Sequence, residues 1–315
     1  MDALSLKPGL YFIGSQQAGS CGVPAVETIE DKSGSWKSAL EKFGPWEPCI
    51  LDVIDDLDAK QAWLAKGYEG DESVFILDKC HSTMDALRQI NSRSVLKNWD
   101  SVIAVIQTAG RGQHGRKWLS APGNLFASLC WPPPGTQGGS RAWWTNMTSL
   151  LAGAAIADFF SSIGIDLEIK WPNDLLYKGR KICGILVEEF GNSVVVGVGV
   201  NIESAPESRE LCAQGSIPAA SLSEIGLEFS PLDLWLKMVS RVKAFFSRII
   251  CYDDSEFFIN HLTSRLAWKK RRIVIRNLFA GEISGILSGI SRDGGLEIIH
   301  NGRIKVIHNG RISLQ

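Results

Sequence analysis

The sequence contains no long apolar run and no marked excess of one charge. Its 315 residues include 33 Lys and Arg against 34 Asp and Glu, which gives a formal net charge of −1 at pH 7. No uninterrupted apolar stretch is long enough to span a membrane, and the N-terminus lacks the charged-then-apolar pattern of a signal peptide. We therefore expect no membrane partner and a cytoplasmic location. The neutral balance also argues against nucleic acid as a partner.

Closely spaced cysteine pairs are absent as well. The seven cysteines are scattered, and no two form a Cys-x-x-Cys pair. An odd, scattered set favours reduced core residues over disulfides or zinc ligands. At 315 residues, the chain is long enough for two or three domains, and its 45% hydrophobic residues are typical of a globular protein.

The first seventy residues show little regular patterning. They begin with Gly-, Ser- and Pro-rich material, and the apolar spacing then predicts one helix over Ile50–Lys66. There is no pair of short helices joined by a tight turn and no basic recognition helix, so a small accessory domain is favoured over a DNA-binding one.

A glycine- and arginine-rich stretch, residues 110–118, follows the apolar run 101–108. The run predicts a buried strand, and the glycines allow a sharp turn and a close backbone approach to a ligand. Arg111, Arg116 and Lys117 suit a bound phosphate or carboxylate. Taken alone, a solvated basic turn explains this stretch about as well.

Regular elements are predicted on both sides of this loop. Ser82 and Thr83 are natural N-caps for a helix over 84–90, and Asp85 falls in its first turn. The apolar patterns predict strands over 74–77, 124–131, 166–170, 181–189 and 197–201, and helices over 143–163 and 231–249.

The C-terminal part reads as strands and turns. A basic run, residues 268–272, leads into a strand over 273–275, and a solvated strand edge is favoured over a phosphate-binding patch. Turns are expected at Asp293-Gly294-Gly295, Asn301-Gly302 and Asn309-Gly310. Together these features predict a small antiparallel barrel.

Several motifs occur in a fixed order: Ser82-Thr83-Met84-Asp85, the loop 110–118, Lys170-Trp171-Pro172-Asn173-Asp174, the run 181–188 and Gly197-Val198-Gly199-Val200-Asn201. In this order they resemble the catalytic domain of biotin protein ligases, from about Val74 to Gln315. The resemblance does not cover the first seventy residues. It implies an α/β (α+β) fold with a mixed sheet and flanking helices, followed by a small C-terminal β-barrel. The expected domains are an accessory segment 1–70, a catalytic domain 71–267 and the barrel 268–315.

The resemblance also implies roles for individual residues. Ser82, Thr83 and Gln107 would hydrogen-bond the ureido ring of biotin. The catalytic residues would be Lys181, Arg111 and Asp174. The biotin site would comprise Ser82, Thr83, Met84, Gln107, Arg111, Gly112, Gln113, Lys181 and Gly184. The ATP site would comprise Arg116, Trp118, Lys170, Asn173 and Asn201.

Lys181 is the strongest catalytic candidate. A fixed cation beside the biotin carboxylate and the ATP phosphates lowers their repulsion and stabilises charge moving onto pyrophosphate. Asp174 would hold magnesium or orient Lys181, although a turn-stabilising Asn173-Asp174 pair is a sufficient structural explanation. Trp118, Trp131 and Trp171 are either core residues or ligand-stacking residues.

The implied substrates are ATP and biotin. Mg²⁺ would be held mainly by ATP phosphates, with Asp174 as a candidate ligand and no dedicated metal site. The partner would be the biotin carboxyl carrier domain of a biotin-dependent carboxylase, and the resemblance allows a homodimer. Two alternatives stay open: a lipoate or octanoate ligase or acyltransferase of the related fold, and a non-catalytic biotin-binding regulator.

Gln113 departs from the commonest family form of the loop, which has arginine there. Glutamine donates hydrogen bonds but cannot neutralise charge. We therefore expect weaker retention of biotinyl-AMP than in arginine-bearing relatives.

Overall fold

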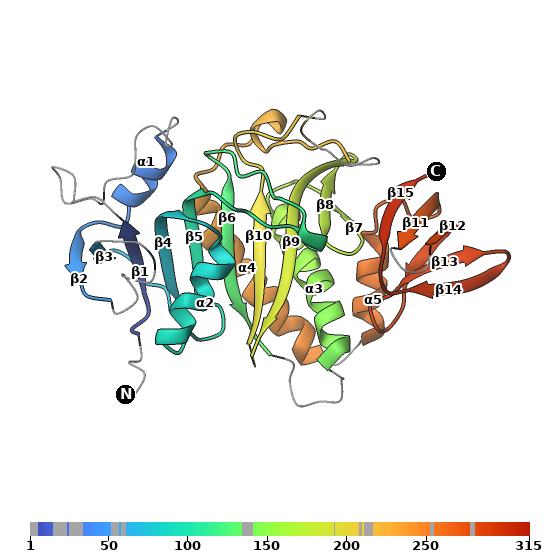
Figure 1. The fold of residues 1–315 in the computed structure, drawn as a ribbon, viewed down its shortest axis with the longest axis horizontal. Helices are drawn as coiled ribbons and strands as arrows, with labels where there is room; N and C mark the ends of the chain where they lie inside the picture. Colours follow the sequence, from blue (N-terminus) through green and yellow to red (C-terminus); the bar gives the residue numbers. More distant parts are fainter. Residues whose placement is uncertain are drawn as a thin grey trace. The chain divides into compact units, whose positions relative to one another are not determined.

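Figure 1 shows the fold in the computed structural model, which describes residues 6–14, 24, 34–51, 57, 61–133, 141–191, 193–207, 210, 217–252, 255–277 and 281–315. Two units divide the chain. The first comprises Met1–Pro133, Leu186–Pro206 and Ala220–Val239, and the second comprises Pro134–Ile185, Glu207–Ala219 and Ser240–Gln315. Strand β9 (Arg180–Phe190) and helix α4 (Pro231–Tyr252) have residues in both units.

The first unit contains a mixed sheet. Its strand order is β2 (Trp46–Cys49), β3 (Gln61–Ala65), β1 (Gly9–Gly14), β4 (Ser73–Cys80), β5 (Ser101–Gln107), β6 (Leu125–Trp131) and β10 (Ser193–Val200). Strand β4 is parallel to β1 and β5, whereas β6 is antiparallel to β5 and β10. All seven residues of β6 are buried, as the continuous apolar runs predict for strands covered on both faces.

The prediction of a helix over Ile50–Lys66 is wrong for the part of this segment that the structure describes. Residues 61–65 form β3, which pairs with β1 and β2, while residues 52–56 and 58–60 lie outside the described residues. Helical spacing over a short apolar segment did not reveal these two strand partners, and tertiary pairing overrides local preference. The N-terminal segment therefore extends the sheet at β4, and it also carries helix α1 (Ser35–Glu41).

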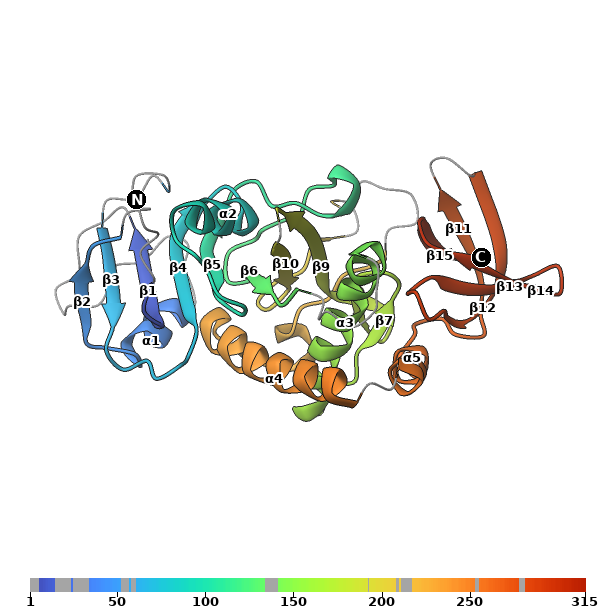
Figure 2. The same ribbon diagram turned by 90° about the horizontal axis from the view of Figure 1, so that it is seen from below.

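Helix α2 (Thr83–Arg93) packs on β5, β6 and β10 of the first unit, and Figure 2 shows it from a second side. Its buried apolar residues include Met84, Leu87 and Ile90, which recur at helical spacing. Short 3₁₀ turns occur at Gln113–Gly115 and Ser223–Ile225. This packing places the N-terminal end of α2 beside the residues that end β5.

The second unit contains helix α3 (Arg141–Ser162) packed on β7 (Glu168–Lys170) and β8 (Asp174–Tyr177). Strand β8 pairs antiparallel with both β7 and β9. A Cβ at Gly153 would lie 3.7 Å from Ile185 Cδ1 and 3.7 Å from Leu175 Cδ2, which is ordinary van der Waals contact, so α3 lies close to these side chains. The predicted helix and strands in this part are confirmed.

A five-stranded antiparallel sheet completes the second unit and corresponds to the predicted barrel. Its order is β14 (Arg303–Ile307), β13 (Leu296–His300), β12 (Gly281–Ile290), β11 (Arg272–Asn277) and β15 (Arg311–Leu314), with helix α5 (Ser255–Ser264) against β12. The β13–β14 turn places Asn301 and Gly302 at φ values of 49° and 76°, as a tight hairpin requires. Lys269, Lys270 and Arg271 are exposed ahead of β11. The predicted fold class is confirmed.

Within the part of the chain that the structure describes, every helix is too short or too polar to cross a membrane.

Candidate functional site

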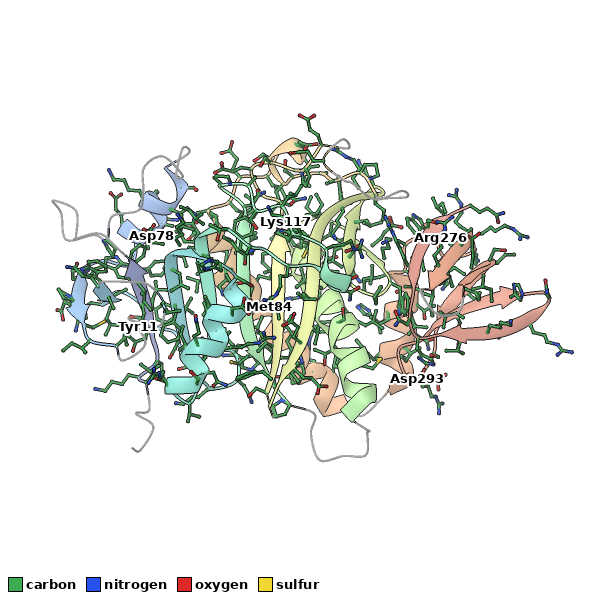
Figure 3. The ribbon with its side chains drawn as sticks, in the orientation of Figure 1. Tyr11, Asp78, Met84, Lys117, Arg276 and Asp293 are labelled. Atoms are coloured by element: carbon green, nitrogen blue, oxygen red, sulfur yellow. The ribbon has the colours of Figure 1, made fainter. Side chains whose placement is uncertain are left out.

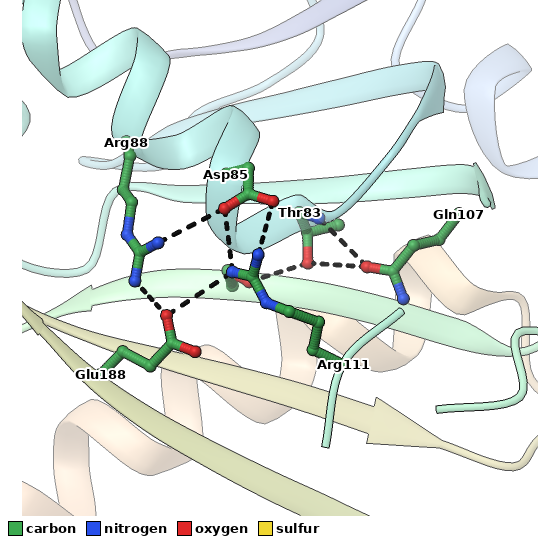
Figure 4. A network of polar contacts seen from close by, with 7 residues as sticks. Thr83, Asp85, Arg88, Gln107, Arg111 and Glu188 are labelled. Carbon is green, nitrogen blue, oxygen red and sulfur yellow. Dashed lines mark hydrogen bonds and ion pairs between the residues drawn. The ribbon is translucent and has the colours of Figure 1, made fainter. Parts of the chain in front are cut away.

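The N-terminus of α2 is held by a side chain from the end of β5. Gln107 Oε1 accepts hydrogen bonds from the Thr83 backbone N–H at 3.0 Å and the Thr83 hydroxyl at 3.3 Å (Figure 4). Its Nε2 donates to Ser120 Oγ at 3.0 Å, and the Thr83 and Ser128 hydroxyl oxygens lie 2.8 Å apart. These contacts orient the amide of Gln107, one of the predicted ureido contacts.

Ser82 occupies the N-cap position, as predicted, but its hydroxyl does not cap the helix. The Thr83 N–H, which is unsatisfied at a helix start, is bonded by Gln107 instead. Ser82 and Thr83 are each only 3% exposed. Capping therefore does not account for the Ser82 hydroxyl.

The glycine-rich loop folds back on itself. The backbones of Arg111 and Lys117 form an isolated antiparallel β-bridge. The Gly112 N–H donates to the Arg116 carbonyl at 2.7 Å, and the Trp118 N–H donates to the Gly110 carbonyl at 2.9 Å. The Gln113 carbonyl accepts the Arg116 N–H at 3.3 Å. A Cβ at Gly110 would lie 2.6 Å from both Gln107 Nε2 and Ser120 Oγ, which explains a glycine there. The sequence prediction of a tight loop is confirmed.

Arg111 belongs to a ring of alternating charges in the first unit, shown in Figure 4. Its Nη1 and Nη2 lie 2.7 Å and 2.9 Å from the two carboxylate oxygens of Asp85, and Nη2 lies 3.5 Å from Glu188 Oε2. Arg88 contacts the same Asp85, at 3.3 Å, and also Glu188. The hydrogen bond to Asp85 raises the pKa of Arg111, so its guanidinium stays charged.

Two glycines of β10 receive side chains from neighbouring segments. Met84, labelled in Figure 3, is 3% exposed, and its Sδ would lie 2.9 Å from a Cβ at Gly197. The Trp118 ring lies over Gly199, where an added Cβ would be 2.5 Å from Cε2. Trp118 is therefore a half-buried residue of the loop that rests on β10, next to Arg116 and Lys117, which are exposed.

In the second unit, Asp174 lies between two lysines. Its Oδ1 is 2.6 Å from Lys181 Nζ and its Oδ2 is 3.0 Å from Lys170 Nζ. Burial acts to raise the pKa of Asp174, but the charges and hydrogen bonds of Lys181 and Lys170 outweigh it and lower that pKa to about 2. Burial lowers the pKa of Lys170, and Asp174 partly offsets this effect. The result is an ionised carboxylate that fixes two ammonium groups.

Asn173 and Gly184 lie beside this group. The side-chain amide of Asn173 donates to the Ile185 backbone carbonyl at 2.7 Å, and the backbone carbonyl of Asn173 accepts the Ile185 N–H at 2.9 Å. Gly184, which is buried, is the pairing partner of Asp174 across β8 and β9. Asn173 therefore ties the turn before β8 to the strand that carries Lys181.

Three other candidates have structural contacts. Asn201 is 2% exposed, and its amide donates to the Ala220 carbonyl at 3.1 Å. Trp131 is 2% exposed and packs edge-on against Trp99 at 5.3 Å between ring centroids. Trp171 is 3% exposed, and its Nε1 donates to the Gly294 carbonyl at 3.0 Å. For Trp131 and Trp171, core packing explains the side chain.

Comparison with known proteins assigns the family. Residues 77–203 match the biotin/lipoate A/B protein ligase family. The bifunctional ligase/repressor BirA of Salmonella typhimurium is 32% identical over 258 residues, which cover 73% of this chain and 76% of the relative. The chain belongs to the biotin protein ligase family. The biotin–[acetyl-CoA-carboxylase] ligase of Paracoccus denitrificans is 32% identical over 214 residues, which cover 62% of this chain and 82% of the relative.

A solved structure of the biotin protein ligase family agrees with the fold. The biotin protein ligase from Aquifex aeolicus in complex with biotin and ATP superposes with a TM-score of 0.64 at 27% identity, over 77% of this chain and 98% of that one. The resemblance recognised from the ordered motifs is therefore confirmed.

The predicted residues of this family member form two groups, one in each unit. The first holds Ser82, Thr83, Met84, Gln107, Arg111, Gly112, Gln113, Arg116, Trp118 and Asn201, and the second holds Lys170, Asn173, Asp174, Lys181 and Gly184. Sequence reasoning missed Arg88 and Glu188. The three-residue spacing of Asp85 and Arg88 was a usable signal for a helical ion pair, but Glu188 is a hundred residues from Arg88.

Proposed function

We propose that this protein is an ATP-dependent biotin protein ligase. In the first step, a biotin carboxylate oxygen attacks the α-phosphorus of ATP, the bond to the bridging oxygen breaks, and biotinyl-5′-AMP and pyrophosphate form. In the second, a carrier lysine amine attacks the acyl carbonyl, AMP leaves, and an amide forms. Membership of the family and the similarity to a ligase in complex with biotin and ATP support this proposal.

The observation that carries the chemistry is the Lys181–Asp174 ion pair of 2.6 Å. An ammonium group held by an ionised, buried carboxylate keeps one orientation, so it stabilises developing charge without reorganising during the reaction. Lys181 is our candidate for the cation between the biotin carboxylate and the α-phosphate, and Asp174 orients it. Lys170 shares the same carboxylate and is assigned to the nucleotide.

We assign the biotin ring to the first group of residues. Thr83 and Gln107 already share hydrogen bonds, so their polar atoms are pre-positioned for a ureido group. Ser82, Met84, Gly112 and Gln113 complete that surface, and Gly184 is assigned a close backbone approach to biotin. Arg111 is assigned to the anionic part of the ligand.

We assign the nucleotide to Arg116, Trp118, Lys170, Asn173 and Asn201. The half-buried Trp118 ring offers a stacking surface, and Arg116 is exposed on the loop. Both oxygens of Asp174 face ammonium groups, an arrangement suited to orienting Lys181 and unsuited to a divalent cation. We therefore assign Mg²⁺ to the ATP phosphates, where it would neutralise phosphate charge.

The acceptor in this proposal is a lysine of a biotin-carrying protein, specifically the carboxyl carrier domain of a biotin-dependent carboxylase, and the proposed location is the cytoplasm. Because the mixed anhydride already has a good leaving group, no enzyme nucleophile is required. We also propose that the segment 1–70 and the barrel 268–315 are domains separate from the catalytic domain 71–267.

The decisive experiment is ATP–pyrophosphate exchange with biotin, and separately with lipoate and octanoate, in wild type and Lys181→Ala. We expect exchange with biotin and a loss on the order of a hundredfold or more in the variant. Lys305→Ala, which removes an exposed lysine of β14, serves as the matched control.

Each alternative has its own signature in this experiment. Preferential exchange with lipoate or octanoate would indicate a ligase for linear acids, which the comparisons do not favour. Biotin binding without exchange or carrier labelling would indicate a non-catalytic regulator. Exchange that persists in Lys181→Ala would remove Lys181 from its assigned role.

A further inference from the structure

The charge ring around Arg111 contains two cations and two anions. Asp85 lies on α2, Glu188 on β9 and Arg111 at the start of the glycine-rich loop. Each arginine contacts both carboxylates, so the ring closes on itself (Figure 4). The side chains are between 25% and 40% exposed, which leaves them accessible to a dissolved anion.

Asp85 occupies the part of Arg111 that an anionic ligand needs. The two terminal nitrogens of Arg111 contact the two oxygens of Asp85 at 2.7 Å and 2.9 Å. This end-on, two-point contact is the geometry by which arginine binds a free carboxylate or phosphate. A ligand carboxylate or phosphate that binds Arg111 end-on must therefore displace Asp85.

Arg88 makes this displacement feasible. When one member of an ion pair leaves, the cost arises mainly from the charge that stays behind without a partner. Arg88 already lies 3.3 Å from Asp85 Oδ1 and also contacts Glu188. If Arg111 turns toward a ligand, both carboxylates therefore keep a cationic partner.

We propose that Asp85 is an internal competitor for Arg111, and that Arg88 permits the exchange by staying on Asp85 and Glu188. This inference rests on the proposed function in one respect, the assignment of Arg111 to the anionic part of the ligand. Asp85 thereby sets ligand affinity. The ligand class is an anion with two acceptor oxygens, either the carboxylate of the acid substrate or a phosphate of the nucleotide.

The test measures dissociation constants by titration calorimetry for biotin, its neutral amide and ATP. Asp85→Asn retains the side-chain shape but loses the charge. We expect it to tighten binding of biotin or ATP roughly three- to tenfold, consistent with a partly exposed ion pair. The neutral amide should bind equally to both proteins if the carboxylate is the competing group, and a gain confined to ATP would assign Arg111 to a phosphate.

Two further variants test the arrangement of the ring. Arg88→Met leaves Arg111 as the partner of both carboxylates, so it should weaken binding of the same ligand, and adding Asp85→Asn should restore it. In an Arg111→Met background, Asp85→Asn should have no effect. Asp233→Asn, which breaks the Lys42–Asp233 pair elsewhere in the first unit, is the matched control for loss of a charge.

The opposite results would overturn the inference. Weaker binding of both biotin and ATP in a folded Asp85→Asn protein would mean that Asp85 positions Arg111 for the ligand. A gain that persists in the Arg111→Met background would mean that Asp85 acts through another group. These are binding measurements, so they are independent of the exchange experiment. Absence of exchange in wild type would reject the proposed function and leave the binding results valid. A failed Asp85→Asn prediction would reject the inference about Asp85 and would say nothing against exchange in wild type.

Discussion

Asp174 and Lys181, on the paired strands β8 and β9, form an ion pair of 2.6 Å between Oδ1 and Nζ. The other carboxylate oxygen contacts Lys170, the partner of Asp174 across β7 and β8, at 3.0 Å. One carboxylate on the middle strand thus fixes a lysine from each neighbour. A cation held in this way is already oriented before any substrate binds.

Asp174→Asn should lower both stability and activity. The substitution leaves the ammonium groups of Lys170 and Lys181 without their anion, and breaking a buried ion pair costs about 3–5 kcal/mol. Urea unfolding measures the loss. Glu282→Gln, which removes the exposed Arg276–Glu282 pair, is the control and should cost less than about 1 kcal/mol. Equal losses in the two variants would contradict the role of Asp174.

The stability that Asp174 contributes should disappear only in strong acid. Its pKa falls from 3.8 to about 2 on folding, so its contribution is present above about pH 4 and is lost as the pH falls toward 2. The shift corresponds to roughly 2 kcal/mol. The difference in unfolding free energy between wild type and Asp174→Asn should be constant near neutral pH and should shrink by roughly 2 kcal/mol as the pH falls below about 4. A decrease in this difference between pH 7 and pH 5 would contradict the lowered pKa.

Thr83→Val should disturb the end of β5 more than Thr83→Ser does. Valine removes the hydroxyl that contacts Gln107 and Ser128 in a buried position, at an expected cost of about 1–3 kcal/mol. Because Gln107 loses one of its orienting bonds, the KM for biotin should also rise, and calorimetry and exchange kinetics measure the two effects. Serine retains the hydroxyl and loses only the methyl group, so an equal defect in both variants would contradict the role assigned to the hydroxyl contacts.

Gly199→Ala and Gly197→Ala form a matched pair on β10. The new Cβ at residue 199 would meet the rigid Trp118 ring at 2.5 Å, whereas at residue 197 it would meet the flexible Met84 side chain at 2.9 Å. We expect Gly199→Ala to cost about 1–3 kcal/mol and to displace the Trp118 ring, and Gly197→Ala to cost less. Tryptophan fluorescence and thermal unfolding provide the readouts. A larger effect at residue 197 would reverse this interpretation.

Gln113→Arg should slow the release of biotinyl-AMP. The substitution adds a cation to the loop where the commonest family form has one, and a guanidinium binds phosphate in two-point contact. The dissociation rate of the intermediate, measured by trapping with a carrier protein, should fall by roughly tenfold or less. A slow rate in wild type that Gln113→Arg does not decrease further would refute the role of Gln113.

Local patterns were reliable where one strand or helix determines its own burial. The apolar run 101–108 contains β5, and the run 231–249 lies within α4. A short continuous apolar run is buried as a strand, and apolar residues at helical spacing are buried as one face of a helix. The pattern failed at Ile50–Lys66, where β3 depends on two partner strands. Ser82 was correctly placed at the N-cap, but the side chain that holds the helix is Gln107, from a separate strand.

The amino-acid sequence by itself determined the order of the motifs, the family they indicate and the residue types of the candidate site, including Lys181, Asp174 and the glycine-rich loop. Only the tertiary structure decided which charges meet. Asp174 lies between Lys170 and Lys181 because β7, β8 and β9 pair in one register. Arg111 meets Asp85 and Glu188 because a helix, a loop and a strand converge. Ion pairs depend on distances of a few ångströms, and sequence separation does not determine those distances.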